Sequence, residues 1–185
     1  MRQARRFVYF LLHADPNFVK ALVAEINSLR EVVGQCTNCF RYFEGDGAQC
    51  IVCRDGTRDH HTLVVVEKDT DLELIQKSSV FGGQYFVLGG LLPLVEKKTT
   101  AVIRERELKE RIESEAKQHE LREVVLALSA NPQGDNTRYH LMQALEPLVK
   151  KHSITVTALG RGLSTGTEVE YSDAETIKNA FHNRH

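Results

Sequence analysis

The sequence is poor in several residue types and has almost no charge excess. Its 185 residues include no tryptophan, two methionines and four prolines. The 24 basic and 25 acidic side chains give a formal net charge of −1, which excludes a uniformly basic nucleic-acid binder and leaves only local patches for such contacts. No apolar run approaches the ~20 residues that a membrane-spanning helix needs, so no membrane partner is expected. The 42% hydrophobic and 26% charged content is typical of a folded globular protein.

Two helices are predicted at the start of the chain. In residues 2–13 apolar side chains recur at helical spacing. Asp15 and Pro16 suit the N-cap and the first position of a second helix, and Gly34 suits its end. We expect the second helix to bury one apolar stripe, because its large apolar residues follow each other at steps of three and four: Phe18, Leu22, Ile26, Leu29 and Val33.

From residue 62 onward, short β-branched runs alternate with helical patterns. This alternation predicts an α/β unit with a largely parallel sheet. Helices are expected over residues 71–77, within residues 134–151 and over residues 173–181. The predicted strands cover residues 62–66, 85–88, 124–128 and 154–158.

A charge-rich segment covers residues 96–123. We interpret it as a solvated helix, because several glutamates lie four positions before a basic residue. These predicted ion pairs are Glu105–Lys109, Glu107–Arg111 and Glu113–Lys117.

The four cysteines all lie in one short stretch, as two Cys-x-x-Cys pairs separated by ten residues. Each pair can hold two thiolates on one side of a tight turn, and four thiolates complete a tetrahedral zinc shell with no open position. Two disulfides conflict with a reducing compartment, and a redox-active pair would not need a duplicate. The spacing therefore predicts one structural Zn²⁺ per chain, bound by Cys36, Cys39, Cys50 and Cys53.

Carboxylates follow the first predicted strand of the α/β unit. Glu67 ends the strand, and Asp69 and Asp71 follow within one turn, where parallel sheets bind ligands. These groups could hold Mg²⁺ for phosphoryl transfer; the alternative is that Asp71 only caps the next helix. After the third predicted strand, Asp135 is the single carboxylate, so any Mg²⁺ site is weak. This argues against a nuclease, a primase or a topoisomerase.

The N-terminus carries arginines before the first acidic residue. On a helix, Arg2 and Arg6 share one face and could contact successive phosphates. The alternative is a solvated helix start. Cations at a helix N-terminus are mildly unfavourable, which hints that an anionic partner approaches this end.

These features, in this order, resemble the RecR family of bacterial recombination mediators. The most specific combination is the four-cysteine finger followed closely by residues 63–67 and then by residues 85–91. The resemblance covers nearly the whole chain. Further matching stretches are residues 6–12, 50–55, 130–132, 162–163 and 170–171.

The resemblance implies an α/β protein with four parts. These are N-terminal helices in residues 1–34, a four-cysteine zinc finger in 35–58, a Toprim domain with a mostly parallel, Rossmann-like sheet in 60–160, and a C-terminal segment in 161–185. The N-terminal helices resemble a helix-hairpin-helix unit whose first part is missing. Glu67 and Asp71 would occupy the family's first acidic motif, as a partner-docking or Mg²⁺ site. Arg2 and Arg6 match the family's basic, DNA-contacting helix.

The resemblance also implies a function. The family's Toprim domain is generally non-catalytic, so no enzymatic activity is expected. Similar members form rings around DNA and act with RecF and RecO proteins to load RecA recombinase on gapped DNA. We therefore expect DNA, RecF- and RecO-type proteins and further copies of the chain, as a dimer or tetrameric ring, as partners in the bacterial cytoplasm and nucleoid. The alternatives are a Mg²⁺-dependent Toprim phosphodiester enzyme and a protein-interaction module without DNA contact.

Overall fold

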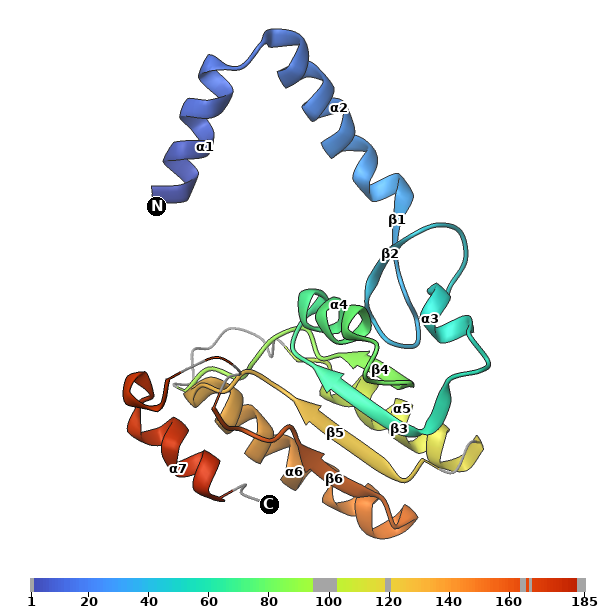
Figure 1. The fold of residues 1–185 in the computed structure, drawn as a ribbon. Helices are drawn as coiled ribbons and strands as arrows, with labels where there is room; N and C mark the ends of the chain where they lie inside the picture. Colours follow the sequence, from blue (N-terminus) through green and yellow to red (C-terminus); the bar gives the residue numbers. More distant parts are fainter. Residues whose placement is uncertain (1, 95–102, 119–120, 164–165, 167, 183–185) are drawn as a thin grey trace.

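The computed structural model describes residues 2–94, 103–118, 121–163, 166 and 168–182. Figure 1 shows a helical arm, a small finger beneath it, an α/β domain and a C-terminal helical segment. The predicted α/β fold class is confirmed. In the described part of the chain, no helix combines the length and the apolar character that crossing a membrane requires.

The helical arm consists of α1 (Arg2–His13) and α2 (Pro16–Val32). Asp15 caps α2, because its carboxylate accepts hydrogen bonds from the backbone N–H groups of Asn17 at 2.8 Å and Phe18 at 3.3 Å. The predicted helices are confirmed, but the predicted burial of the α2 stripe is wrong for the single chain. Phe18, Ile26 and Leu29 are each about half exposed. The reason is that the arm projects away from the α/β domain (Figure 1).

The finger begins where α2 ends. Strands β1 (Val33–Gln35) and β2 (Tyr42–Glu44) pair antiparallel, and the short helix α3 (Ile51–Arg54) follows. The first cysteine pair lies in the turn between β1 and β2, and the second lies at the N-cap of α3 and within this helix. It is too small to form a core alone, so it packs against the α/β domain.

The α/β domain contains a four-stranded, fully parallel sheet in the order β4-β3-β5-β6. The predicted strands are confirmed, with bounds that shift by up to three residues. Successive side chains along a strand point to opposite faces, so the sheet has two core layers. The strands are β3 (Asp59–Val66), β4 (Gly83–Val87), β5 (Glu123–Ala127) and β6 (Thr155–Ala158).

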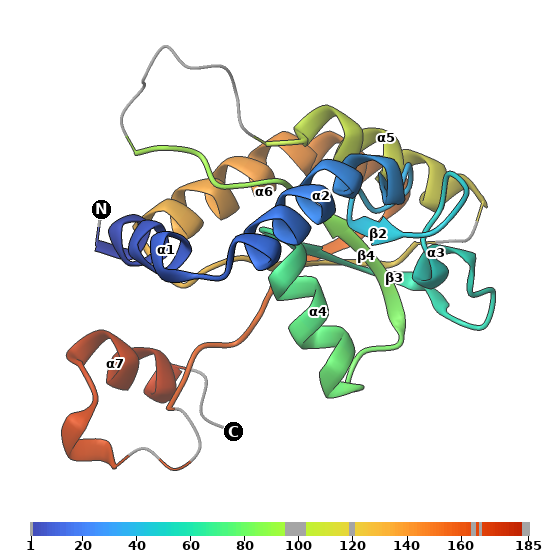
Figure 2. The same cartoon turned by 90° about the horizontal axis from the view of Figure 1, so that it is seen from above.

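Helices cover the two faces unequally. Helix α4 (Asp69–Ser78) lies on one face, while α5 (Glu105–Gln118) and α6 (Pro132–His152) lie on the other (Figure 2). On the α5 and α6 face, Leu63 and Val65 pack with Ile112 and Leu141. On the α4 face, the finger joins the core, because buried cysteines and Val52 pack with strand and helix residues such as Val64, Val66, Leu72 and Tyr85.

The charge-rich segment differs from the prediction of a solvated helix. Helix α5 buries Leu108 and Ile112 completely and leaves Glu115 only 5% exposed. Residues 96–102 and 119–120 of the segment lie outside the described residues.

The ion pairs along α5 agree with the prediction in two of three cases. Lys109 binds Glu105 at 2.6 Å, and Lys117 binds Glu113 at 2.8 Å. Arg111 binds Glu115 at 2.8 Å instead of Glu107, because Glu115 is buried beside it and also contacts His60 at 3.0 Å.

Helix α6 begins two residues before the expected range of 134–151. Asn131 is the N-cap and Pro132 the first helical residue, so Gly134 and Asp135 lie within the first turn. A Cβ at Gly134 would lie 1.9 Å from the carbonyl oxygen of Ser129, so only glycine fits there.

The C-terminal segment leaves the sheet after β6. It contains a short 3-10 helix (Val169–Tyr171) and helix α7 (Ala174–His182), which agrees with the predicted helix. Figure 2 shows this segment extending away from the sheet. Tyr171 is 77% and Phe181 64% exposed.

Candidate metal centre and acidic sheet edge

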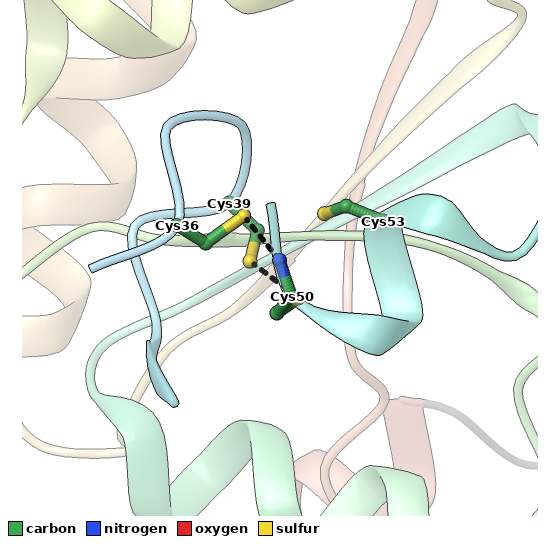
Figure 3. A group of neighbouring side chains, drawn as sticks. All are labelled: Cys36, Cys39, Cys50 and Cys53. Atoms are coloured by element: carbon green, nitrogen blue, oxygen red, sulfur yellow. Dashed lines mark hydrogen bonds between the residues drawn. The ribbon is translucent and has the colours of Figure 1, made fainter. Parts of the chain in front are cut away.

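The four cysteines meet in space. Their sulfur atoms all lie within 4.8 Å of one another. One pair comes from the turn between β1 and β2 and the other from the start of α3 (Figure 3). Cys36, Cys39 and Cys50 are buried, and Cys53 is partly exposed. The Sγ atoms of Cys39 and Cys50 lie 3.6 Å apart, close to the roughly 3.8 Å that tetrahedral ligation with Zn–S bonds of about 2.3 Å requires.

Backbone hydrogen bonds shape the first cysteine turn. The Phe40 N–H donates to the Cys36 carbonyl at 2.9 Å, and the Cys50 N–H donates to the Cys36 sulfur at 3.4 Å. A hydrogen bond from a backbone N–H group to a cysteine sulfur stabilises the thiolate and orients it as a ligand. The Cys39 thiol lowers the pKa of Cys36 through a hydrogen bond, and the same contact raises the pKa of Cys39. Buried thiols in such close contact are the donor set that a bound cation would deprotonate together.

The donor set fits a structural metal. Four sulfur ligands close a tetrahedral shell, so a bound ion would have no open position for a substrate. Among the described residues, this is the one group of three or more histidine, cysteine or acidic side chains arranged to hold a metal ion.

Glu67 lies at the carboxyl end of β3, where the strand order of the sheet reverses direction. Its carboxylate accepts a hydrogen bond from the hydroxyl of Ser129, which follows the neighbouring strand β5. Ligands of open parallel sheets bind at this kind of position. The structure therefore places Glu67 at the expected edge and brings it together with a residue that the sequence pattern did not single out.

Asp69 and Asp71 are both engaged within the fold. The Asp69 carboxylate accepts a hydrogen bond of 2.7 Å from the backbone N–H of Tyr42 in the finger. The Asp71 carboxylate accepts one of 3.3 Å from the backbone N–H of Lys68, the N-cap of α4. Asp71 thus caps its helix, and Asp69 ties the finger to the domain.

Asp135 faces two arginines. Arg138 Nη2 lies 3.1 Å from its Oδ1, and Arg161 contacts both carboxylate oxygens, with Nη1 3.1 Å from Oδ2. The hydrogen-bonded Arg161 guanidinium lowers the pKa of Asp135, and the Arg138 charge acts in the same direction. Sequence reasoning did not identify Arg161; its position three residues after the last strand of the sheet was the available signal.

The two arginines proposed from the sequence lie at the far end of the arm. Arg2 and Arg6 are exposed on α1 and are four residues apart, so they share one face of the helix. Helix α1 contains no acidic residue. Arg5 is also exposed and adds a third positive charge to this end.

Comparison with known proteins agrees with this architecture. The Toprim domain family model matches residues 62–159, which contain the whole parallel sheet except the first residues of β3. "Recombination protein RecR" of Paenarthrobacter aurescens is 34% identical over 99% of this chain and 87% of its own length. The proteins of the same name from Chloroflexus aurantiacus and Geobacter sp. are 34% and 35% identical over 99% of this chain and cover 85% and 87% of their own lengths. This chain, with its four-cysteine finger followed by a Toprim domain, belongs to the RecR family of recombination proteins.

Proposed function

We propose that the protein is a non-enzymatic mediator of recombinational DNA repair. In this role it acts with RecF- and RecO-type partners to help load a RecA-type recombinase onto gapped or single-stranded DNA. Membership of the RecR family supports a role in recombination. The observation that carries the non-enzymatic part is that Glu67, Asp69, Asp71 and Asp135 are each hydrogen-bonded within the fold rather than converging on one point.

The acidic edge argues against Mg²⁺-dependent phosphodiester chemistry. Such sites need carboxylates with free oxygens that converge on the ion. Here Ser129 occupies an oxygen of Glu67, and Arg161 neutralises Asp135. This pattern favours the mediator over the enzyme. The same edge of the sheet, with Glu67 and Asp71, is proposed as the docking surface for RecO- or RecF-type proteins.

The cysteine cluster is proposed to hold one Zn²⁺ with a structural role. Cysteine sulfur is the preferred ligand of Zn²⁺ in closed four-coordinate sites. The ion would fix the finger against the α4 face of the sheet, where buried cysteines already belong to the core. In this way the metal would add stability that so short a unit lacks.

DNA contact is proposed at the N-terminal end of the arm, through Arg2 and Arg6. Exposed arginines contact phosphates without reading sequence, so binding would be non-specific and sensitive to salt. Such binding fits a protein that works on gapped DNA wherever a gap occurs, in the bacterial cytoplasm and nucleoid.

The arm also supports self-association as a dimer or tetrameric ring. The rings of Phe7, Phe10 and Phe18 form a contiguous aromatic group, with centroid distances of 6.4 and 5.8 Å. All three side chains are about half exposed, and no residue of α1 or α2 is buried. Contiguous apolar surface of this kind marks a protein interface. A second copy of the chain would bury it.

The test is fluorescence anisotropy of a labelled gapped duplex titrated with the full chain in Mg²⁺, at low and at moderate salt. The length of the DNA is checked afterwards. Salt-sensitive binding with intact DNA is the expected result. Cleaved DNA would overturn the non-enzymatic proposal, and no binding at low salt would overturn the DNA contact of this chain alone.

A further inference from the structure

The finger closes the carboxyl end of the edge strand β4. The N–H of Val87, the last residue of this strand, donates to the carbonyl of Cys39 at 2.7 Å. The carbonyl of Val87 accepts a hydrogen bond of 3.0 Å from Arg104 Nη1. The next amide, that of Leu88, donates inward to Val66 of β3 at 2.8 Å. The N–H and C=O groups of Val87, which point away from the sheet, are therefore hydrogen-bonded by Cys39 and by Arg104.

Phe40, the residue after Cys39, is held in an unfavourable backbone conformation. Its φ of +62° lies in the left-handed region, which bulky side chains avoid. Its ring lies edge-on to Phe86 at 5.3 Å, and the Arg104 guanidinium lies over it at 5.4 Å. On the other side, the Phe40 N–H is bound to the Cys36 carbonyl. The ligand turn and the sheet together hold this conformation, so loosening the turn would allow Phe40 to relax.

The same contacts reach the acidic edge of the sheet. Gly89 has a φ of +95°, and a Cβ there would lie 2.6 Å from Arg104 Nη1, so Arg104 packs directly on this backbone. The Gly89 N–H donates to the carbonyl of Glu67 at 2.9 Å. Arg104 thus connects the ring of Phe40 with the backbone that positions Glu67.

A second connection runs from the finger to α4. The Tyr42 N–H binds the Asp69 carboxylate at 2.7 Å, and Arg41 Nη1 binds the side-chain oxygen of Gln76 at 2.9 Å. Both residues follow the first cysteine turn directly. The finger therefore contacts α4 near both of its ends, and one of these contacts occupies an acidic side chain at the sheet edge.

We propose that metal occupancy of the four-cysteine site controls the acidic edge of the sheet, through Phe40, Arg104 and Val87. In the metal-bound state Val87 is capped, and Asp69 is held by Tyr42. In the metal-free state the cysteine turn loosens, Phe40 relaxes, the end of β4 opens, and the turn from Glu67 to Asp71 is released. The core layer under α5 and α6 remains, because the finger contributes only Phe40 to its surroundings. The finger is thus a metal-sensitive switch; this inference rests on the proposed metal site of the four cysteines, but not on the proposed role in DNA repair.

The test is residue-resolved amide hydrogen exchange by NMR on the full chain, first loaded with Zn²⁺ and then stripped with a chelator. We expect the amides of Val87 and Gly89 to exchange on the order of tenfold faster without metal, while the amide of Val65 in the central strand is unchanged. Loss of protection in residues 36–53 alone would overturn the proposal. An equal loss across the whole domain would also overturn it, because the metal would then stabilise the fold globally.

A pair of arginine variants tests the connection itself. In Arg104→Ala, the Gly89 amide should exchange rapidly even with metal bound, and stripping the metal should change it little further. Arg106→Ala is the matched control, since this side chain is 80% exposed and binds Glu107 and Glu110 at the surface. It should respond to metal as the unaltered chain does. A full metal response at Gly89 in Arg104→Ala would overturn the role of Arg104.

Discussion

Arg161 and Asp135 form a bidentate ion pair at the carboxyl edge of the parallel sheet. Asp135 lies in the first turn of α6, and Arg161 follows the end of β6 by three residues. The pair neutralises the one carboxylate that follows β5 closely, and it fixes the start of the C-terminal segment to the domain. Arg161 thus occupies the carboxylate oxygens of Asp135 that a Mg²⁺-dependent enzyme would leave free to bind the ion.

Replacing Arg161 should raise the pKa of Asp135. The arginine lowers this pKa in the folded protein. The ion pair therefore stabilises the fold fully above the unfolded pKa of about 3.9, and this stabilisation is lost as the pH falls through the lower, folded pKa. In Arg161→Ala the carboxylate should titrate closer to its ordinary value, and the loss of stability on acidification should be smaller. Carbon-detected NMR titration of the Asp135 carboxyl measures the change. Arg161→Lys should give an intermediate pKa, and an unchanged pKa in Arg161→Ala would contradict the ion pair.

Gly134 should be intolerant of any side chain. The alanine Cβ would lie 1.9 Å from the Ser129 carbonyl, so Gly134→Ala must displace either α6 or the end of β5. We expect a loss of about 3 kcal/mol in the free energy of unfolding, measured by urea denaturation. The control is Gly82→Ala, where the added Cβ meets nothing within 4 Å. Similar stabilities of the two variants would contradict the close approach.

Local sequence patterns predicted the elements of this fold well. The cysteine spacing, the β-branched runs and the Asp15-Pro16 helix start each act over a few residues. The contacts that define the acidic edge do not: Arg161 binds Asp135 across 26 residues, and Asp69 binds Tyr42 across 27. Such pairs depend on the order of the strands and on where the finger docks, and neither is encoded in a local pattern.

Periodicity also identifies an apolar face without saying what covers it. The stripe of α2 was correctly placed on one helix face, yet Ile26 and Leu29 remain half exposed in the single chain. Conversely, the charge-rich α5 packs on the sheet, because Leu108 and Ile112 are enough to anchor it among many charges. Burial is a property of the assembled structure, so local sequence patterns misjudged both helices.

Removing one cysteine ligand should release the metal and weaken the finger. We expect the unaltered chain to retain one Zn²⁺ through dialysis and Cys50→Ser to retain almost none, because a closed four-sulfur shell loses a charged donor. The melting temperature should fall by about 5 °C or more. Elemental analysis and a thermal melt measure these two effects. Thr37→Ala is the control, since it loses only one exposed hydrogen bond, to the Ala48 carbonyl. One Zn²⁺ retained per chain in Cys50→Ser would contradict the assignment.

A charge placed in the aromatic group of the arm should disrupt self-association. Phe10 contacts both Phe7 and Phe18, so Phe10→Glu would put a carboxylate at the centre of the surface that a second copy should cover. We expect the dissociation constant of the oligomer to rise by about tenfold or more, measured by sedimentation velocity. Leu74→Glu on α4 is the control, because that side chain is 71% exposed and lies outside the arm. Equal dissociation constants for the two variants would locate the interface elsewhere.

The arginines of α1 should determine how DNA binding depends on salt. Each phosphate contact releases condensed counterions, so the logarithm of the binding constant falls with the logarithm of salt concentration by about 0.9 per contact on duplex DNA. If Arg2 and Arg6 each contact one phosphate, Arg2→Ala with Arg6→Ala should reduce the slope by about 2 and weaken binding most at low salt. Anisotropy titrations at several salt concentrations give both values. Lys77→Ala, which removes a cation on α4 with a side chain 78% exposed, should leave the slope unchanged. If the double variant binds with the same affinity and slope as the unaltered chain, the DNA site does not lie on α1, and the arm would serve assembly alone.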